Sequence, residues 1–247
     1  MATNPLFLSL LCEHMKSGHR FPDNVHVVFE TYVDTRLNRD KGRLERRYGL
    51  NTAHLRAAAE NIAFCMASDL KLGLSPTRNR PQTAMGRLGM EVDDRFETFL
   101  DALEYIRLAR SEVAADATHL PTFTFAHRRF QEYFATCIVL REPSRVSPER
   151  LLTDARWRET AVVLCQTQKI VDLTALMDEV QRSLKRFCCT TQDLIDDPVN
   201  YVCEASKDED ASSRGYLTRR PFLWPAGSLH LLGILQDGFG SRLSDLL

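Results

Sequence analysis

The group of residues best suited to do chemistry in this chain is a histidine followed by two arginines. His127 follows residues 123–126, in which phenylalanines alternate with smaller side chains as in a half-buried strand. After it, apolar side chains recur at the i, i+3, i+4, i+7 spacing of an amphipathic helix. A helix N-terminus offers free N–H groups and the positive end of the helix dipole, and both favour phosphate. His127, Arg128 and Arg129 therefore form a candidate phosphate site.

The same residues also allow a purely structural interpretation. Because the helix dipole disfavours a charged imidazole, His127 would be neutral and would hold one N–H donor for a phosphate oxygen. In the structural interpretation, His127 is instead a junction residue that packs on Phe125, and the two arginines are solvated. The residues alone leave both interpretations open.

The sequence contains no complete catalytic apparatus. No Gly-Lys pair occurs, so a GxxxxGK[ST] phosphate loop is absent. The apolar run 162–165 leads into Gln166 rather than into the aspartate that usually holds magnesium. Nucleophile-elbow, zinc-protease and dinucleotide-binding motifs are absent as well. We therefore expect a binding or regulatory protein rather than an enzyme.

The cysteines and histidines show no metal-ligand spacing. The close cysteines are Cys188, Cys189 and Cys203, and adjacent cysteines do not form a zinc motif. The N-terminal histidines His14, His19 and His26 have no partner pattern. Seven cysteines is an odd count, which favours reduced thiols in a cytoplasmic protein. Four of them fall in helical patterns and are expected to be buried: Cys12, Cys65, Cys137 and Cys165.

The composition is that of a globular protein. The chain has 247 residues, of which 44% are hydrophobic and 26% charged, with a net charge of −1. This length suits one large domain or two small ones. Near-zero net charge argues against a general nucleic-acid binder. No apolar run reaches the about 18 residues that span a bilayer, and the run 5–11 lacks the basic residues of a signal peptide. We therefore expect neither nucleic acid nor membrane as a partner.

The elements that would position these residues are mainly helical. Asn4 as a cap and Pro5 at the first helical position open a helix that ends near Gly18. This helix is apolar nearly all round and should be buried on most sides. The basic stretch 36–47 is expected to be a solvated helix end and loop. Further helices are predicted at 24–37, 52–72 and 91–108, a loop at 75–82, and strands at 106–111 and 122–126. Helices followed by a hairpin and the His127 helix are typical of a winged-helix domain.

The C-terminal part shows successive helix faces without strand signals. Another helix is expected over 227–236. The apolar positions of the preceding part are Leu151, Trp157, Ala161, Val162, Leu164, Val171, Leu173, Leu176, Met177, Val180, Leu184 and Phe187. The predicted fold class is therefore mainly α. It comprises a helical domain at 1–48, a winged-helix domain with a small β-hairpin at 49–142, and a second, truncated helical domain at 143–247. Stacked, HEAT-like hairpins are compatible with the last domain, but no repeat is clear.

Two segments resemble the signatures of one protein family. Asn4-Pro5-Leu6-Phe7-Leu8 resembles the Asn-Pro-Leu-x-Leu segment that opens the helical domain behind a NACHT nucleotide-binding domain. Residues 123–135 resemble the Phe-x-His-x-x-Phe-Gln-Glu-Tyr signature of the winged-helix domain in the same NTPases. The order of the segments and their separation also agree, and residues 157–159 resemble the start of the helical domain that follows. The resemblance covers residues 3 to 165.

The resemblance implies a nucleotide switch. NACHT proteins are signal-transduction ATPases of the STAND class. In the family, the proline of the first segment lies against the nucleotide base, and the winged-helix histidine contacts the β-phosphate of ADP in the inactive state. The resemblance assigns these roles to Pro5 and His127. Exchange of ADP for ATP would release His127 and permit oligomerisation, so protein partners or self-association are expected.

The resemblance also implies a part that this sequence does not carry. In the family, a nucleotide-binding domain with Walker motifs and a magnesium site precedes the segment at Asn4. We therefore expect a regulatory fragment without ATPase activity, which binds ADP or ATP stably only with that domain present. Two alternatives stay open. One is a helical interaction module in which Pro5 and His127 have no nucleotide role. The other is a DNA-binding winged helix, which the acidic helix at 91–108 disfavours.

Overall fold

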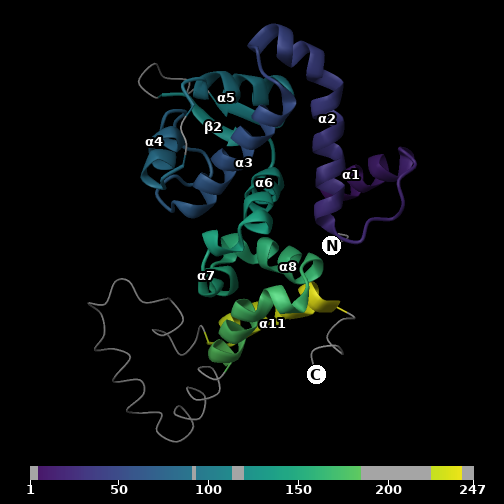
Figure 1. Ribbon diagram of the computed structural model, residues 1–247, viewed down its shortest axis with the longest axis vertical. Coiled ribbons are helices and arrows are strands. Elements are labelled where there is room, and N and C mark those ends of the chain that lie inside the picture. The colour runs from purple at the N-terminus through teal and green to yellow at the C-terminus, as the bar shows by residue number, and fades with distance from the viewer. Residues whose placement is uncertain (1–4, 91–92, 113–119, 185–223, 241–247) are drawn as a thin grey trace, which may run out of the picture. The chain divides into compact units, whose positions relative to one another are not determined.

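The chain is mainly helical with one small antiparallel β-hairpin, as the sequence predicted (Figure 1). The computed structural model describes residues 5–90, 93–112, 120–184 and 224–240. It divides the chain into two units, Met1–Arg145 and Val146–Leu247. The predicted domain boundary between residues 48 and 49 lies inside the first unit and stays a prediction. Among the described helices, none combines the length and the apolar character that crossing a membrane requires.

Helix α1 (Pro5–Lys16) is less buried than its apolar sequence predicted. It packs on α2 (Val25–Tyr48), and only Leu10 and His14 of α1 are buried. Leu8 and Met15 are 41% and 43% exposed. The prediction of burial on most sides is therefore wrong for the described residues, because burial depends on how many neighbours pack around a helix and not on its composition.

Helix α2 runs through the basic stretch that the sequence analysis assigned to a helix end and loop. It begins at Asn24, whose side chain accepts a hydrogen bond from the Val27 N–H at 3.1 Å. It ends at Gly49, whose positive φ of 64° is a conformation that glycine adopts without strain. Leu37 and Leu44 are buried on one face of this stretch. Buried apolar positions therefore continue the helix while its arginines face solvent.

The remainder of the first unit follows the order of a winged-helix domain. Its elements are α3 (Thr52–Ser68), α4 (Arg80–Arg87), α5 (Phe96–Tyr105), β1 (Ala109–Glu112), β2 (Thr122–Phe125) and α6 (Arg128–Arg141). Between α3 and α4, Thr77 forms an isolated antiparallel bridge with Thr122 and so places a third backbone segment beside β2. The loop predicted at 75–82 runs into α4, which the sequence analysis missed and which has Pro81 in its first turn. Residues 113–119 lie outside the described residues, and with them most of the hairpin tip predicted at 114–121.

The β-hairpin and helix α3 hold the start of α6 in place. The register pairs Ala109 with Phe125. Phe123 and Phe125 are buried, with their ring centroids 5.6 Å apart, and Phe125 lies 5.7 Å from Phe134 of α6. On another side, α3 packs along α6. Residue 127, between β2 and α6, is therefore fixed by buried contacts on both sides of the chain.

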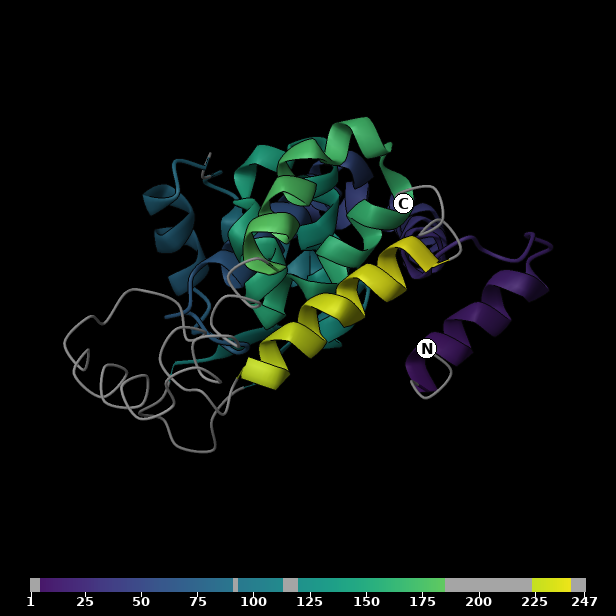
Figure 2. The same cartoon turned by 90° about the horizontal axis from the view of Figure 1, so that it is seen from below.

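The second unit is helical, as predicted. Its elements are α7 (Pro148–Thr153), α8 (Arg158–Thr167), a helix over 174–184, and α11 (Trp224–Phe239), with short 3-10 turns at Ala155–Trp157 and Ile170–Leu173; another such turn, Pro143–Arg145, ends the first unit. In Figures 1 and 2, α11 lies beside α8. Gly238 permits this approach, because a Cβ there would lie 2.5 Å from the Cβ of Cys165. Most of the predicted apolar positions are buried, but Val171 is 77% exposed and Met177 and Leu184 are half-buried. Phe187 lies outside the described residues.

Candidate functional site

His127 is the N-cap of α6 and is exposed. Its backbone is extended, with φ −147° and ψ 143°. The ring Nδ1 accepts a hydrogen bond from the backbone N–H of Arg129 at 3.1 Å. In a neutral ring, an accepting Nδ1 places the proton on Nε2. His127 therefore caps the helix with one nitrogen and keeps an N–H donor on the other.

The first turn of α6 offers fewer free donors than the sequence predicted. The N–H of Arg129 donates to the His127 ring, and the N–H of Phe130 donates to the His127 carbonyl at 2.9 Å. The side chains of Arg128 and Arg129 both reach Glu132, at 2.9 Å each. The positive charge beside His127 is therefore partly balanced by one carboxylate. His127 is exposed, and none of its described contacts uses the ring Nε2.

Pro5 lies in the same unit as His127 but on a different helix. It is the first residue of α1 and is exposed. In Figure 1, α2 lies between α1 and α6, and it packs on both. Among the described contacts, no hydrogen bond or ring contact joins Pro5 to His127. Their shared use as a nucleotide site stays a prediction.

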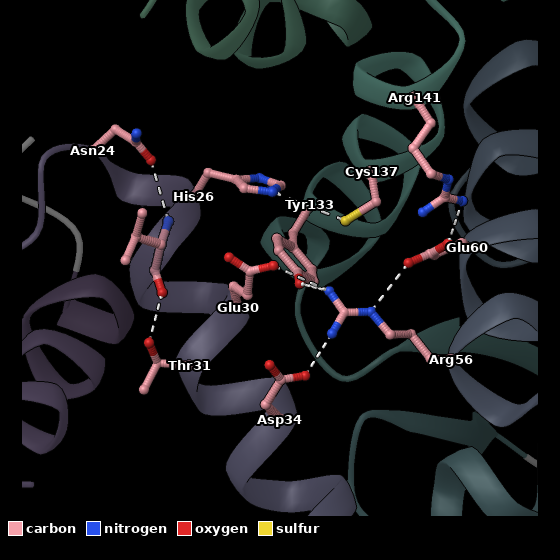
Figure 3. Close-up of polar contacts among 11 residues, drawn as sticks. Asn24, His26, Glu30, Thr31, Asp34, Arg56, Glu60, Tyr133, Cys137 and Arg141 are labelled. Carbon is pink, nitrogen blue, oxygen red and sulfur yellow. Dashed lines mark hydrogen bonds and ion pairs between the residues drawn. The ribbon is translucent and has the colours of Figure 1, made fainter. Parts of the chain in front are cut away.

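A second cluster, which we call the Arg56 network, joins α2, α3 and α6 (Figure 3). Arg56 of α3 contacts two carboxylates of α2, with Nη1 2.5 Å from Asp34 and Nη2 3.5 Å from Glu30. Its Nε lies 3.2 Å from Glu60 on its own helix. Its Nη2 also donates to the hydroxyl of Tyr133 on α6 at 2.6 Å. One guanidinium group therefore holds three helices together.

Glu60 extends this network to the far end of α6. Its side chain is 4% exposed, and its second oxygen accepts from Arg141 Nη2 at 2.5 Å. Both carboxylate oxygens of Glu60 are thus paired with arginines, which a buried charge requires. The start of α6 is fixed by the hairpin, and Tyr133 and Arg141 fix the rest of the helix.

A histidine and a cysteine meet beside the network but do not form a nucleophilic pair. Cys137 Sγ lies 4.0 Å from His26 Nε2. Burial, followed by the nearby Glu60 charge, raises the pKa of Cys137 to about 11. Burial and the Arg56 charge lower the pKa of His26 to about 4. A reactive cysteine needs the opposite shift toward thiolate, so this pair is packed as a neutral thiol and a neutral imidazole.

The predictions for the individual cysteines had mixed outcomes. Cys65, Cys137 and Cys165 are free and buried as predicted, whereas Cys12 is free but exposed, because it lies on the poorly covered helix α1. Burial raises the pKa of Cys65 to about 12. Cys188, Cys189 and Cys203 lie outside the described residues. Within the described ranges, no group of His, Cys, Asp or Glu side chains is placed to hold a metal ion.

The sequence analysis missed the Arg56 network, although part of its signal is local. Arg56 and Glu60 stand four residues apart on α3, as do Glu30 and Asp34 on α2. Such i, i+4 spacing places side chains on one helix face. The contacts from Arg56 to Asp34 and Tyr133 join residues 22 and 77 positions apart, and no local pattern reveals them.

Comparisons with protein-family models, curated proteins and solved structures find no match for this chain.

Proposed function

We propose that this chain is the regulatory part of a NACHT-type nucleotide switch, in which His127 donates a hydrogen bond to the β-phosphate of bound ADP. The observation that carries the proposal is that the two ring nitrogens of His127 have different roles. Nδ1 is occupied in capping α6, while Nε2–H is held at the surface of the strand-to-helix junction. A donor fixed in this way suits a phosphate oxygen. The winged-helix order of elements and the two segments that resemble the NACHT family support the same proposal.

The residues present fit a partial nucleotide site. His127 would supply one phosphate contact, and the exposed Pro5 would lie against the base. A phosphate loop and magnesium ligands, which these residues do not supply, would come from a nucleotide-binding domain. We therefore expect this chain alone to hold ADP or ATP weakly and to hydrolyse neither.

The Arg56 network supplies a means of transmitting the nucleotide state. His127 caps α6, and Tyr133 of α6 binds the guanidinium that also binds α2. In the proposal, loss of the β-phosphate contact frees α6 to adopt a second arrangement and exposes surfaces for self-association. A ligand biases such an equilibrium only through contacts that differ between the two states, and His127 would make that contact.

The first test follows the imidazole itself. In ¹H–¹⁵N spectra of the histidine rings, we expect ADP to shift the Nε2 signal of His127 and AMP to leave it in place, because AMP has no β-phosphate. The other histidines of the chain serve as internal controls. An equal response to AMP and ADP would contradict a β-phosphate contact.

A second test uses this chain joined to a nucleotide-binding domain. If the DNA upstream of Met1 encodes a phosphate-loop domain, the fused polypeptide should retain ADP, and His127→Ala should weaken that retention about 10-fold, as loss of one charge-assisted hydrogen bond does. His54→Ala is the matched control, since His54 is also exposed in the first turn of a helix. Equal ADP retention by wild type and His127→Ala would refute the switch role.

A nucleotide-independent interaction module is the second candidate, and the surface of α1 favours it. Leu8 and Met15 are partly exposed on a helix that packs on α2. If this surface binds protein, Leu8→Gln together with Met15→Gln should abolish self-association in light scattering, and ADP should have no effect on the oligomeric state. A nucleotide-dependent change in oligomeric state would exclude this candidate.

The structure gives DNA binding little support. The helix that precedes the hairpin, α5, exposes Glu97 and Asp101, which are 59% and 57% exposed and are paired with Arg78. Carboxylates on this helix repel a phosphate backbone. Tight, salt-sensitive binding of duplex DNA at low ionic strength would overturn this view.

A further inference from the structure

The C-terminal half of α2 and the turn after α5 line a pocket of about 390 Å³ that is open to solvent. We call it the arginine pocket. Its lining residues are Arg36, Arg39, Asp40, Arg43, Tyr105 and Arg107. It belongs to the first unit and does not include the His127 junction or the Arg56 network.

Positive charge in the arginine pocket is not balanced. Asp40 is 4% exposed and is shared by two arginines, with Arg39 at 3.1 Å and Arg43 at 3.4 Å. Arg36 donates to the neutral hydroxyl of Tyr32 at 3.0 Å. For Arg107, no ion pair is found with any residue that the structure describes. Four guanidinium groups thus surround one carboxylate.

The nearest acidic residues of α5 are already engaged elsewhere. Asp101 lies 2.6 Å from Arg78 Nη2, and Glu104 lies 2.5 Å from Arg78 Nη1. Glu104 also accepts from the hydroxyl of Ser111. These carboxylates are therefore committed to Arg78, and the positive charge of the pocket is available to a ligand.

The backbone of Arg107 is strained in a way that favours a role for its side chain. Its φ of 62° is in the left-handed region. All the other described residues with a positive φ are glycines. Glycine adopts this conformation without steric cost, whereas an arginine does not. Strain of this kind is found at functional sites, where the side chain serves a purpose that glycine cannot. At this position the arginine adds a fourth guanidinium group to the lining of the pocket.

We propose that the arginine pocket binds a compact ligand that carries two or more adjacent phosphate groups. Guanidinium groups bind phosphate oxygens through paired N–H donors, and several of them can share one oligophosphate. A small ligand suits the site better than a nucleic acid does, because the pocket lies beside the acidic face of α5 and the chain has a net charge of −1.

Titration calorimetry with sodium tripolyphosphate tests the proposal. We expect one binding site per chain, with an affinity at least about 10-fold higher than for orthophosphate, because only the longer anion reaches several arginines. Arg39→Gln with Arg43→Gln should weaken tripolyphosphate binding at least about 10-fold. Arg46→Gln is the matched control: Arg46 is an exposed arginine of the same helix, bonded to the carbonyl of Gly42 and outside the pocket lining.

Arg107→Gly provides a sharper variant, because glycine removes the charge and relieves the strain together. It should weaken tripolyphosphate binding by several fold without lowering the melting temperature. A variant that binds tripolyphosphate as tightly as wild type would overturn the role of Arg107. Equal weakening by Arg46→Gln and by the Arg39→Gln, Arg43→Gln pair would mean non-specific charge attraction and would overturn the pocket.

Two further experiments make two distinctions. One distinguishes a lipid headgroup from a soluble phosphate ligand, and the other distinguishes the arginine pocket from the His127 junction. Binding to phosphatidylcholine vesicles with and without a bisphosphorylated phosphoinositide shows whether a lipid headgroup replaces the soluble anion. If neither tripolyphosphate nor these vesicles bind, the proposal is overturned. His127→Ala should keep full tripolyphosphate affinity. If His127→Ala abolishes it, the anion binds at the α6 junction, which refutes the arginine pocket and leaves the proposed function standing.

Discussion

Two arginine-rich regions lie along helix α2, and they differ in how their charge is balanced. In its first half, Glu30 and Asp34 face Arg56 of α3, which also binds Glu60 and Tyr133. In its second half, arginines on α2 and Arg107 surround the single carboxylate of Asp40. Arg56 is 24% exposed, whereas Arg39 and Arg43 are 59% and 65% exposed.

The difference separates a structural cluster from a ligand site. A half-buried arginine whose three nitrogens all contact protein acceptors stabilises the arrangement of helices and offers little to a ligand. Exposed arginines that share one acid contribute little to stability and keep donors free. The first region should therefore respond to mutation through folding, and the second through binding.

The largest expected effect comes from removing the centre of the paired region. Arg56→Ala leaves the buried Glu60 with one arginine partner and the Tyr133 hydroxyl without its donor. Loss of one partner from a buried ion pair should lower the free energy of unfolding by about 3 kcal/mol. Urea denaturation measures this change.

Arg43→Ala is the matched control in the other region. Arg43 is 65% exposed and the buried Asp40 keeps its pair with Arg39, so the free energy of unfolding should fall by less than about 1 kcal/mol. Equal losses of stability for Arg56→Ala and Arg43→Ala would remove the distinction between the two regions.

The next effect is a dependence of stability on pH through His26. Burial and the positive charge of Arg56 lower its pKa in the folded state to about 4, whereas the unfolded value is 6.5. Between these values the unfolded chain binds a proton that the folded chain does not. The contribution is therefore fully present above pH 6.5 and is lost as the pH falls toward 4. Allowing for partial exposure of the ring, the loss should be about 2 kcal/mol.

Denaturation curves from pH 7 to pH 4 measure this loss, and His26→Gln removes the titrating group. The groups that face His26 are the Tyr133 ring, with its centroid 4.8 Å away, the Cys137 thiol and the Arg56 charge. The difference in unfolding free energy between wild type and variant should shift in favour of the variant as the pH falls. A constant difference over this pH range would show that burial and Arg56 do not lower the pKa of His26 in the folded chain.

A smaller effect is expected from one hydroxyl in each region. Tyr133→Phe removes a buried acceptor at 2.6 Å from Arg56 and should lower the free energy of unfolding by about 1 kcal/mol. Tyr32→Phe removes the acceptor of Arg36, at 3.0 Å beside the arginine pocket, and should lower it by less than about 0.5 kcal/mol. Thermal and urea denaturation of both variants decide the order, and a larger loss for Tyr32→Phe would reverse the comparison.

The local part of this structure could be predicted from the sequence. Alternation of Phe123 and Phe125 predicted the strand, and the apolar period after His127 predicted α6, because both patterns record which side of an element is buried. The prediction of a solvated helix end and loop in the basic stretch was wrong, because Leu44 continues the buried face to which Leu37 belongs, and the charged side chains between them do not interrupt the helix.

The long-range part could not be predicted. The burial of α1 depends on neighbours that no local pattern specifies, and the partners of Arg56 come from two other helices. For His127, the sequence placed the residue at the helix start. It did not show that the ring itself would use the N–H of Arg129 and so fix which nitrogen faces outward.

The smallest expected effect has the opposite sign and tests the arginine pocket through stability. Arg107→Gly should raise the free energy of unfolding by about 0.5 kcal/mol, because relief of the left-handed strain exceeds the added backbone entropy of glycine in the unfolded chain. Arg110→Gly is the control: this exposed residue of β1 pairs with Thr124, and glycine there should lower stability by about 0.5 kcal/mol. Urea denaturation resolves the two signs. If Arg107→Gly destabilises the chain as Arg110→Gly does, Arg107 stabilises the turn and is not held there for a ligand. A gain in stability would mean that the chain keeps an arginine where glycine folds better, as a binding site requires and a structural cluster does not.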